Sequence, residues 1–333
     1  MCFVHAYWGA ARRLRGWRRQ MGWRWRKLAG TSSPPPPETI VVGCVAENDP
    51  RFLAQARRLT LSLRWFGGSL AGARMLVCVV EGISAQDRRA LEEAGAEVRI
   101  VGRFDARNGS ANKLQFFPEA LAAGARGLLL LDCDMVVVRD PLPLLEGGCL
   151  QARIADVPSV THDAFRRLFR HYGLPLPRRR YRTTLSPERT IRYCNSAMVF
   201  LPRQLAGEFV PVWREWNARI LDALELLGPC AHHCHQASLT LAMAAHPIPF
   251  AAAPVALHFP MHMGHLPPVH ALFAADPVIL HYHQEIDGRG RLLPSRYPLA
   301  QARIDAFNRR LGAAASRELA AGEISPPASP ARA

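Results

Sequence analysis

Residues 128–138 read LLLLDCDMVVV, and this stretch decides both the fold class and the candidate site. The apolar residues are typical of a buried strand, and Asp132 and Asp134 interrupt them one residue apart. Burying two carboxylates costs free energy unless positive charge compensates them. A divalent cation does so, because carboxylate oxygens are ligands for hard cations. The alternative is that the pair marks a surface turn.

Before this stretch the chain alternates between short apolar runs and segments with helical spacing. The predicted strands are 39–45, 75–80, 98–101 and 128–131, and the predicted helices are 51–66, 84–94 and 112–123. This alternation predicts an α/β fold with a mixed, mostly parallel sheet flanked by helices. Such sheets bind ligands beyond the carboxyl ends of their strands, which is where the two aspartates lie.

The second half of the chain is less regular. Residues 158–192 are expected to form an arginine-rich loop, and residues 258–276 a loop with several prolines and histidines. Further strands are predicted at 197–201 and 278–282, and helices at 204–227, 236–245 and 299–311. The expected domains are a basic, proline-ended, disordered leader (1–37), one α/β domain (38–312), and a helix end with a disordered tail (313–333).

The charge of the chain is strongly positive. Among its 333 residues, 42 basic residues against 27 acidic ones give a net charge of +15, and only Lys27 and Lys113 are lysines. Because arginine is abundant throughout, charge alone is weak evidence for nucleic acid, and no nucleic-acid partner is expected. The leader holds eight of the bases and is expected to be disordered. The alternative is that its arginines and tryptophans make a peripheral contact with an anionic membrane.

The cysteines and apolar segments bear on the compartment. Eight cysteines are too sparse to staple a small secreted fold, and the apolar surroundings of Cys44, Cys78 and Cys133 favour free thiols and a cytoplasmic protein. Prolines interrupt the weakly charged stretch 237–257, so no membrane span is predicted. The basic N-terminus lacks the apolar stretch of a secretory signal.

Two enzyme classes use an Asp-x-Asp pair of this kind. In phosphatases of the haloacid dehalogenase type the first aspartate is a nucleophile, and residues 132–136 (DCDMV) fit that motif. The class also needs a later lysine and a further acidic pair for magnesium. No lysine follows Lys113 in the chain, so this class is kept only as the alternative.

Four segments within about residues 39–285 resemble glycosyltransferase family 8, the group of glycogenin and of bacterial lipopolysaccharide galactosyl- and glucosyltransferases. In order, they are 112–114 (NKL) leading into the Asp-x-Asp strand, 193–200 (YCNSAMVF), 235–239 (HQASL) and 279–282 (ILHY). The resemblance implies a GT-A fold. It also implies transfer of a hexose from a nucleotide-diphosphate sugar, most simply a UDP-sugar, to a glycan, lipid-linked or protein acceptor, with retention at the anomeric carbon.

The resemblance further implies a metal site. Asp132, Asp134 and His281 would bind Mn²⁺ or Mg²⁺, and Asp132 would also face the ribose. Two carboxylates and an imidazole suit manganese and leave positions open for diphosphate oxygens. His281 is therefore expected beside the Asp-x-Asp turn, although 147 residues separate it from Asp134. Without a metal the two carboxylates are expected to repel each other.

The resemblance assigns donor-binding residues as well. Lys113, with Asn112 beside it, would contact the diphosphate or the sugar, while Asn195 and Gln236 would line the donor sugar as catalytic residues. The Lys-Pro-Trp that follows the closing histidine in the family is absent here. Arg289, in the basic segment 288–291, is the candidate to cover the phosphates in its place.

Two departures alter the wall behind the sugar: Ala197 replaces the usual glycine and His235 the usual aspartate, which leaves the sugar unidentified. Three alternatives stay open. Cys230 and Cys234, with the histidines between and beside them, have the composition of a zinc knuckle. The nine arginines between 166 and 192 bind an acidic acceptor or are simply solvated. The chain is a catalytically silent binding protein of the same fold.

Overall fold

The computed structural model describes residues 33–263, 266–267 and 270–323. The leader up to residue 32 and the tail after Glu323 lie outside the described residues, as do the predictions of disorder for them. No described helix is both long and apolar enough to cross a membrane.

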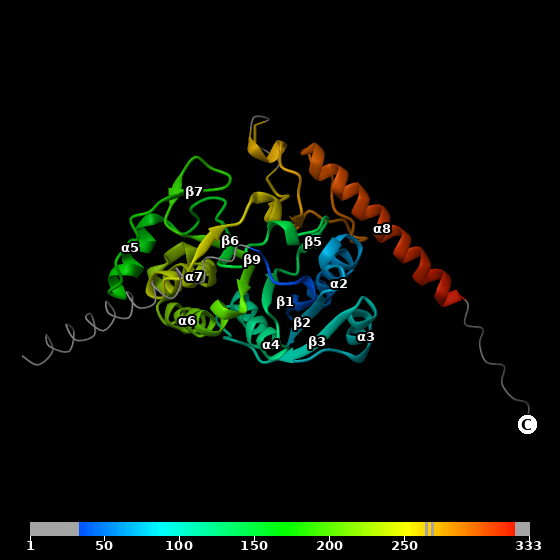
Figure 1. The fold of residues 1–333 in the computed structure, drawn as a ribbon, viewed down its shortest axis with the longest axis horizontal. Coiled ribbons are helices and arrows are strands. Elements are labelled where there is room, and N and C mark those ends of the chain that lie inside the picture. The colour runs from blue at the N-terminus through cyan, green and yellow to red at the C-terminus, as the bar shows by residue number, and fades with distance from the viewer. Residues whose placement is uncertain (1–32, 264–265, 268–269, 324–333) are drawn as a thin grey trace, which may run out of the picture.

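The core is a seven-stranded sheet in the order β10-β6-β9-β4-β1-β2-β3 (Figure 1). The pairs β1/β2, β2/β3, β1/β4 and β6/β10 are parallel, whereas β9 is antiparallel to both of its neighbours. The mixed, mostly parallel sheet predicted from the sequence is thus confirmed. The strands are β1 (Ile40–Ala46), β2 (Arg74–Val80), β3 (Ala96–Val101), β4 (Gly127–Leu131), β6 (Leu150–Ile154), β9 (Cys194–Pro202) and β10 (Phe250–Ala252).

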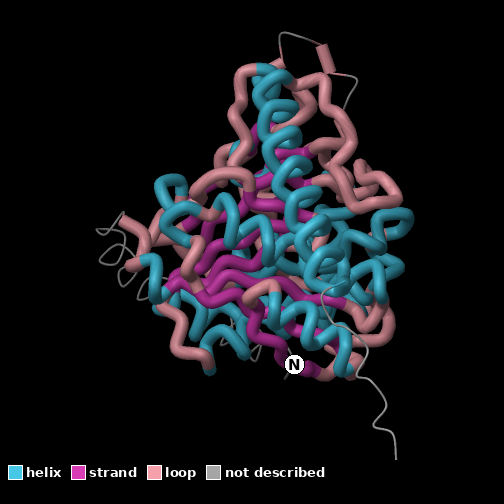
Figure 2. Tube along the Cα trace, turned by 90° about the vertical axis from the view of Figure 1, so that its right-hand side faces the viewer, coloured by secondary structure: helices cyan, strands magenta, loops and turns pink. Residues whose placement is uncertain are grey.

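Both faces of this sheet are apolar, because successive side chains of a strand point to opposite faces. Ile40 and Val42 pack with α2 (Pro50–Phe66) and α3 (Ala85–Glu93), while Val41 packs on the other face with α4 (Phe116–Ala122), α6 (Arg203–Leu221) and α7 (Cys234–Ala245). Figure 2 shows the strands covered by these helices. Burial on both faces of the central strands β1, β2 and β4 explains why they read as continuous apolar runs, whereas the edge strands β3 and β10 are partly exposed.

A second, small sheet continues the Asp-x-Asp stretch. β5 (Met135–Val137) pairs antiparallel with β12 (Ile279–His281), which pairs parallel with β11 (Phe259–Pro260). This sheet packs with the first turns of α8 (Pro298–Glu323) through Leu280 and Ile304. The apolar run read as one strand is therefore two strands in two sheets, separated by the turn that carries the aspartates.

Several expectations need correction. The segment 158–192, expected to be a loop, contains the helix α5 (His162–His171) and the hairpin β7 (Tyr181–Arg182) and β8 (Arg189–Thr190). The Thr161 side chain caps α5 by accepting a hydrogen bond from Ala164 N at 3.2 Å, and the buried Phe165, Leu168 and Phe169 form its inner stripe. Four closely spaced arginines and histidines on its outer face obscured this stripe in the sequence.

Other boundaries shift as well. The predicted helix 112–123 divides into the 3-10 helix η3 (Gly109–Gln115) and α4, the helix expected over 204–227 ends at Leu221, and α8 extends to Glu323. The end of the expected leader packs on the domain, because a Cβ on Gly147 would lie 1.8 Å from the Ser33 carbonyl oxygen.

Candidate active site

The Asp-x-Asp turn lies between β4 and β5, where the chain passes from the large sheet to the small one. Asp132 N donates to the Ala197 carbonyl in β9 at 2.8 Å, and Tyr282 N donates to the Asp134 carbonyl at 3.0 Å. The turn is therefore held from both sides by strands that come much later in the chain. Within the turn Cys133 packs in the apolar core, whereas Asp132 and Asp134 are partly exposed and line the clefts described below.

Asp132, Asp134 and His281 come together as a group that can hold a metal ion, with one ligand atom from each lying within 4.8 Å of the others. His281 Nε2 lies 3.1 Å from Asp134 Oδ1, because β12 pairs with β5 and sets His281 opposite Met135. The prediction that His281 lies beside the turn is confirmed. Two carboxylates and one imidazole make a mixed oxygen and nitrogen set that can hold a divalent cation.

The two carboxylates already have partners. Lys113 Nζ lies 2.7 Å from Oδ1 and 3.0 Å from Oδ2 of Asp132, and this lysine is buried in η3. Burial raises the pKa of Asp134, but the charge and hydrogen bond of His281 outweigh it, so that the pKa falls to about 2. The expectation of an uncompensated, mutually repelling pair is therefore wrong for the metal-free site.

A second histidine contacts the ring nitrogen of His281 that does not face Asp134. His258, fully buried at the end of the 3-10 helix η7 (Val255–His258), places Nε2 at 2.8 Å from Nδ1 of His281. The ring of His283 stacks on that of His281 at a centroid distance of 3.7 Å. Burial is the main cause that holds the pKa of His258 well below its ordinary value. Burial is also the main cause that lowers the pKa of His283 to about 3. Both rings are thus neutral at pH 7.

Two clefts meet at this turn and share Ser110, Asp132 and Asp134. The first, of about 400 Å³, lies at the carboxyl end of β1 and is lined by residues of β1, α2 and η3. The second, of about 470 Å³, lies on the side of β9 and α7. Residues that line the first include Val45, Glu47, Arg51, Phe52, Asn112 and Lys113; residues that line the second include Asp156, Asn195, His235, Gln236, His262 and His283.

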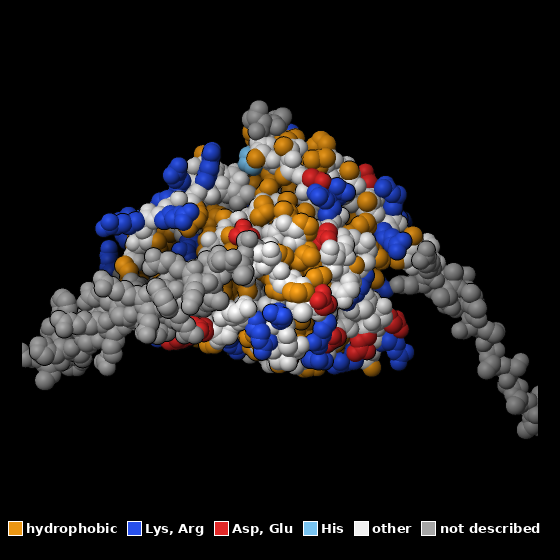
Figure 3. Space-filling model, viewed as in Figure 1, with side chains coloured by type: hydrophobic (Ala, Val, Ile, Leu, Met, Phe, Trp, Pro, Cys, Tyr) orange, Lys and Arg blue, Asp and Glu red, His pale blue; other side chains and the backbone are white. Residues whose placement is uncertain are grey.

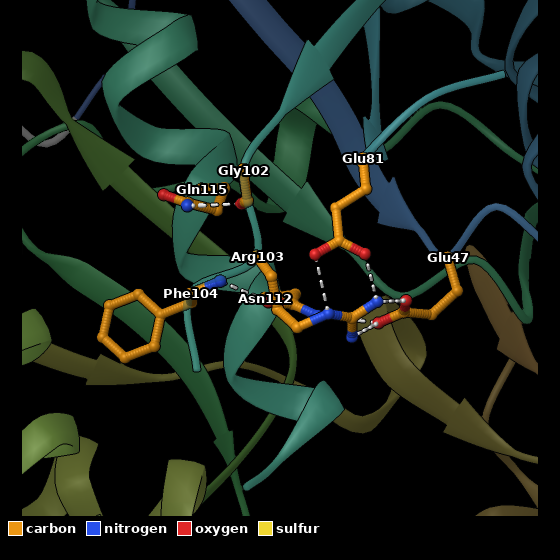
Figure 4. Close-up of polar contacts among 7 residues, drawn as sticks. All are labelled: Glu47, Glu81, Gly102, Arg103, Phe104, Asn112 and Gln115. Atoms are coloured by element: carbon orange, nitrogen blue, oxygen red, sulfur yellow. Dashed lines mark hydrogen bonds and ion pairs between the residues drawn. The ribbon is translucent and has the colours of Figure 1, made fainter. Parts of the chain in front are cut away.

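The wall of the first cleft is fixed by a clamp of charges (Figure 4). The Arg103 guanidinium lies between two carboxylates, with Nη2 at 3.0 Å from both Glu47 and Glu81. Asn112 extends the clamp: its Nδ2 donates to Glu47 at 2.7 Å and its Oδ1 accepts from Phe104 N at 2.7 Å. Both ends of the Asn112 amide are thus hydrogen-bonded within the protein. The contact of Asn112 with the donor stays a prediction.

Close packing brings η3 and its lysine to the sheet. A Cβ on Gly43 would lie 2.3 Å from the Leu76 carbonyl oxygen and 2.5 Å from the Phe116 ring. Only glycine lets Phe116, directly after η3, approach β1 this closely. Gly43 therefore contributes to placing Lys113 against Asp132.

Asn195 and Gln236 both line the second cleft, as a donor-sugar role requires. Asn195 Oδ1 accepts from Ala197 N at 3.0 Å, which leaves its NH₂ group as a donor. Burial, chiefly, holds the pKa of the neighbouring His235 well below its ordinary value, so this ring is neutral. Arg289 lies in the turn that Asp287 caps and lines neither cleft, and its predicted contact with phosphates stays untested.

Several residues of the site escaped the sequence reading, among them Glu47, Ser110, Asp156, His258 and His283. Glu47 follows directly on the first strand, the position where parallel sheets carry ligand contacts, so a signal for it existed. The sequence placed His258 only at the start of the expected loop 258–276. Its partner is 23 residues away, and no local spacing indicates the pairing.

The zinc alternative finds no support in the described part of the chain. Cys230 Sγ donates to the Ser159 carbonyl at 2.9 Å, and Cys234 is a free, buried thiol. Among the residues described, the Asp132, Asp134 and His281 group is the one set of three or more histidine, cysteine or acidic side chains close enough to share a metal.

No protein-family model matches this sequence, and no curated protein is significantly similar to it. Solved structures of similar shape include mouse xyloside xylosyltransferase 1 in its apo form (15% identity, 74% of this chain and 98% of that chain, TM-score 0.45). They also include the bifunctional glycosyltransferase WbbM (13%, 77% and 48%, 0.43) and GlyE of Streptococcus pneumoniae TIGR4 (13%, 87% and 66%, 0.44). These values are too low to assign a family or an activity.

Proposed function

We propose that this protein is a metal-dependent glycosyltransferase that uses a nucleotide-diphosphate sugar, most simply a UDP-sugar, and transfers a hexose with retention. One observation carries the proposal: Asp132, Asp134 and His281 meet at the boundary between two clefts. Such a donor has two parts of different chemistry joined by a diphosphate, and this arrangement offers a place for each. The family 8 resemblance of the four sequence segments agrees with this assignment.

In this proposal the nucleoside lies in the first cleft and the sugar in the second. Val45 and Phe52 supply apolar surface for a base, and Glu47 supplies a carboxylate that accepts from a base N–H or a ribose hydroxyl. Asn195 and Gln236 offer amides to the sugar hydroxyls. Mn²⁺ or Mg²⁺ held by Asp132, Asp134 and His281 would neutralise the charge of the leaving diphosphate. Lys113, already beside Asp132, adds positive charge at the same place.

Retention is argued from the carboxylates around the second cleft. The acidic residues that line it, among those described, are Asp132, Asp134 and Asp156. The first two are the metal donors, and Asp156 is paired with the buried Arg153. None is free to act as a nucleophile toward the sugar. This arrangement favours attack from the face of the leaving group, with a donor phosphate oxygen taking the proton of the acceptor hydroxyl.

The decisive experiment measures UDP release from a set of UDP-sugars with and without Mn²⁺, in the wild type and in Asp134→Asn. We expect release that needs the metal and falls by two orders of magnitude or more in the variant. Thermal shift is expected to be largest when UDP and Mn²⁺ are added together. No release with any sugar nucleotide, combined with a phosphorylated Asp132 detected by mass spectrometry, would establish the phosphatase alternative. Binding without turnover would establish the silent one.

A further inference from the structure

The excess of basic over acidic residues in this protein is confined to two segments. Residues 1–32 contain eight basic residues and no acid, and residues 161–192 contain nine arginines against one aspartate and one glutamate. These two excesses account for the whole net charge of +15, so basic and acidic residues balance over the rest of the chain. A general abundance of arginine therefore does not explain the second segment. Elsewhere in the chain, acidic residues offset the arginines.

The fold brings the second segment to the surface as one patch. Arg166, Arg167 and Arg170 lie on the outer side of α5, opposite its buried stripe, and Arg178, Arg179, Arg182 and Arg189 are exposed on the hairpin β7–β8 and the loop before it. We call these seven residues the arginine face. In Figure 3 basic side chains gather over α5 and β7.

Most of the arginine face has no acidic partner. Arg166 lies 3.4 Å from the exposed Asp163, and the described residues offer no ion pair to the other six. Several arginines elsewhere do have such partners: Arg74, Arg103, Arg107 and Arg303 are each paired with one or two carboxylates. Guanidinium groups bind phosphates in a bidentate manner, so an unpaired cluster of them fits a partner that carries many phosphates.

The shape of the region indicates an extended partner. One hollow that contains a residue of the arginine face, lined by Arg179, Tyr181 and Arg192 among others, has only about 60 Å³, too little for a phosphorylated oligosaccharide. The charges are instead spread over a helix and a hairpin. We propose that the arginine face docks the protein on an anionic phospholipid bilayer, a role that goes beyond the proposed transfer reaction and does not depend on it.

This face adjoins the second cleft. In the loop of the hairpin, Thr184 N donates to the Ala155 carbonyl at 3.1 Å and Leu185 N donates to the Asp156 carbonyl at 2.9 Å. The two acceptor residues, Ala155 and Asp156, line that cleft. Docking through the arginine face therefore holds the cleft close to the bilayer. An acceptor embedded in the membrane would be presented on this side.

The test compares two triple variants of the full chain that lose the same net charge. The face variant carries Arg170→Gln, Arg178→Gln and Arg182→Gln, and the control carries Arg89→Gln, Arg126→Gln and Arg309→Gln, all of them exposed. Both are sedimented with phosphatidylcholine vesicles, with and without phosphatidylglycerol. Each arginine close to an anionic surface strengthens binding about fivefold, so the face variant should bind on the order of a hundredfold more weakly than the control. Wild-type binding should weaken at high salt.

Equal binding of the two variants overturns the proposal, since it means that the leader or the total charge holds the protein on the vesicles. Equal binding of the wild type to both kinds of vesicle also overturns it. If only the affinity for a soluble polyanion such as RNA falls in the face variant, the partner is not a bilayer. Melting temperatures of both variants establish that they fold, and UDP release measured without vesicles should not change. Because UDP release and vesicle binding are measured in different experiments, failure of the proposed reaction can be told apart from failure of the docking proposal.

Discussion

His258 Nε2 lies 2.8 Å from Nδ1 of His281, and the other nitrogen of His281 faces Asp134. A histidine that offers Nε2 to a metal carries its hydrogen on Nδ1, and here that hydrogen has one acceptor, the His258 ring. His258 therefore fixes both the tautomer and the orientation of His281. His258 contacts His281 and is not itself one of the three metal-binding candidates, so it is a positioning residue.

We predict that His258→Phe lowers the affinity for Mn²⁺ by about 10- to 100-fold, since it removes the acceptor and leaves the ring volume. His258→Gln keeps an acceptor and should retain more affinity. Titration of free Mn²⁺ by electron paramagnetic resonance measures this directly. His246→Phe, a change at another buried histidine, is the control and should bind like the wild type. Wild-type affinity in His258→Phe would show that the contact does not position His281.

The pair of Lys113 and Asp132 should stabilise the metal-free fold. Lys113→Met leaves the Asp132 carboxylate without its charged partner, and we expect the free energy of unfolding to fall by about 1–3 kcal/mol. In a double-mutant cycle with Asp132→Asn, urea unfolding should give a coupling energy of about 1 kcal/mol. Strict additivity of the two single changes would mean that the contact contributes nothing to stability.

Asp134→Asn should weaken Mn²⁺ binding strongly and leave the protein folded. The substitution also removes a carboxylate whose ionised form is stabilised by His281. The melting temperature of the metal-free protein should therefore fall by a few degrees. Calorimetry without metal measures this change, with the exposed Asp163→Asn as the control. A higher melting temperature in Asp134→Asn would instead restore the view that the two aspartates repel each other.

Acid sensitivity should come in part from Asp105, which leads into η3. Hydrogen bonds from Arg107 lower the pKa of Asp105 from 3.8 to about 2, and Arg107 also reaches Asp222 at the end of α6. Because the folded state lowers this pKa, the stabilisation is complete above pH 3.8 and is lost as the pH falls toward 2. The melting temperatures of the wild type and Asp105→Asn should therefore converge over this range. Curves that stay parallel down to pH 2 would contradict it.

The first half of the fold was predictable because each of its strands and helices carries a local signal in its own sequence. The strands around Val42, Val77 and Leu129 are apolar runs buried on both faces, and Asp132 marks the place where such a run must end. The position of His281 followed from the resemblance of four separate segments. No local pattern would have placed it.

What escaped prediction depends on contacts between distant residues or on competing local signals. The break between β4 and β5 is enforced by the hydrogen bond to Ala197 and by the pairing with β12, neither of which is visible within residues 128–138. The Arg103 clamp joins residues that follow three different strands. In α5, an apolar stripe was present but was masked by the arginines that share its turns.

The reversed direction of β9 has a consequence for how this protein can vary. Ile154, the last residue of β6, pairs with Cys194, the first residue of β9, so the chain leaves the sheet and returns to it at the same point. Residues 155–193, which include α5 and the hairpin, form an excursion closed at its base. Because its ends already meet, this segment can lengthen, shorten or be exchanged at little entropic cost to the sheet. Under the two proposals made above, acceptor choice and membrane attachment can then diverge while the cleft assigned to the nucleotide stays the same.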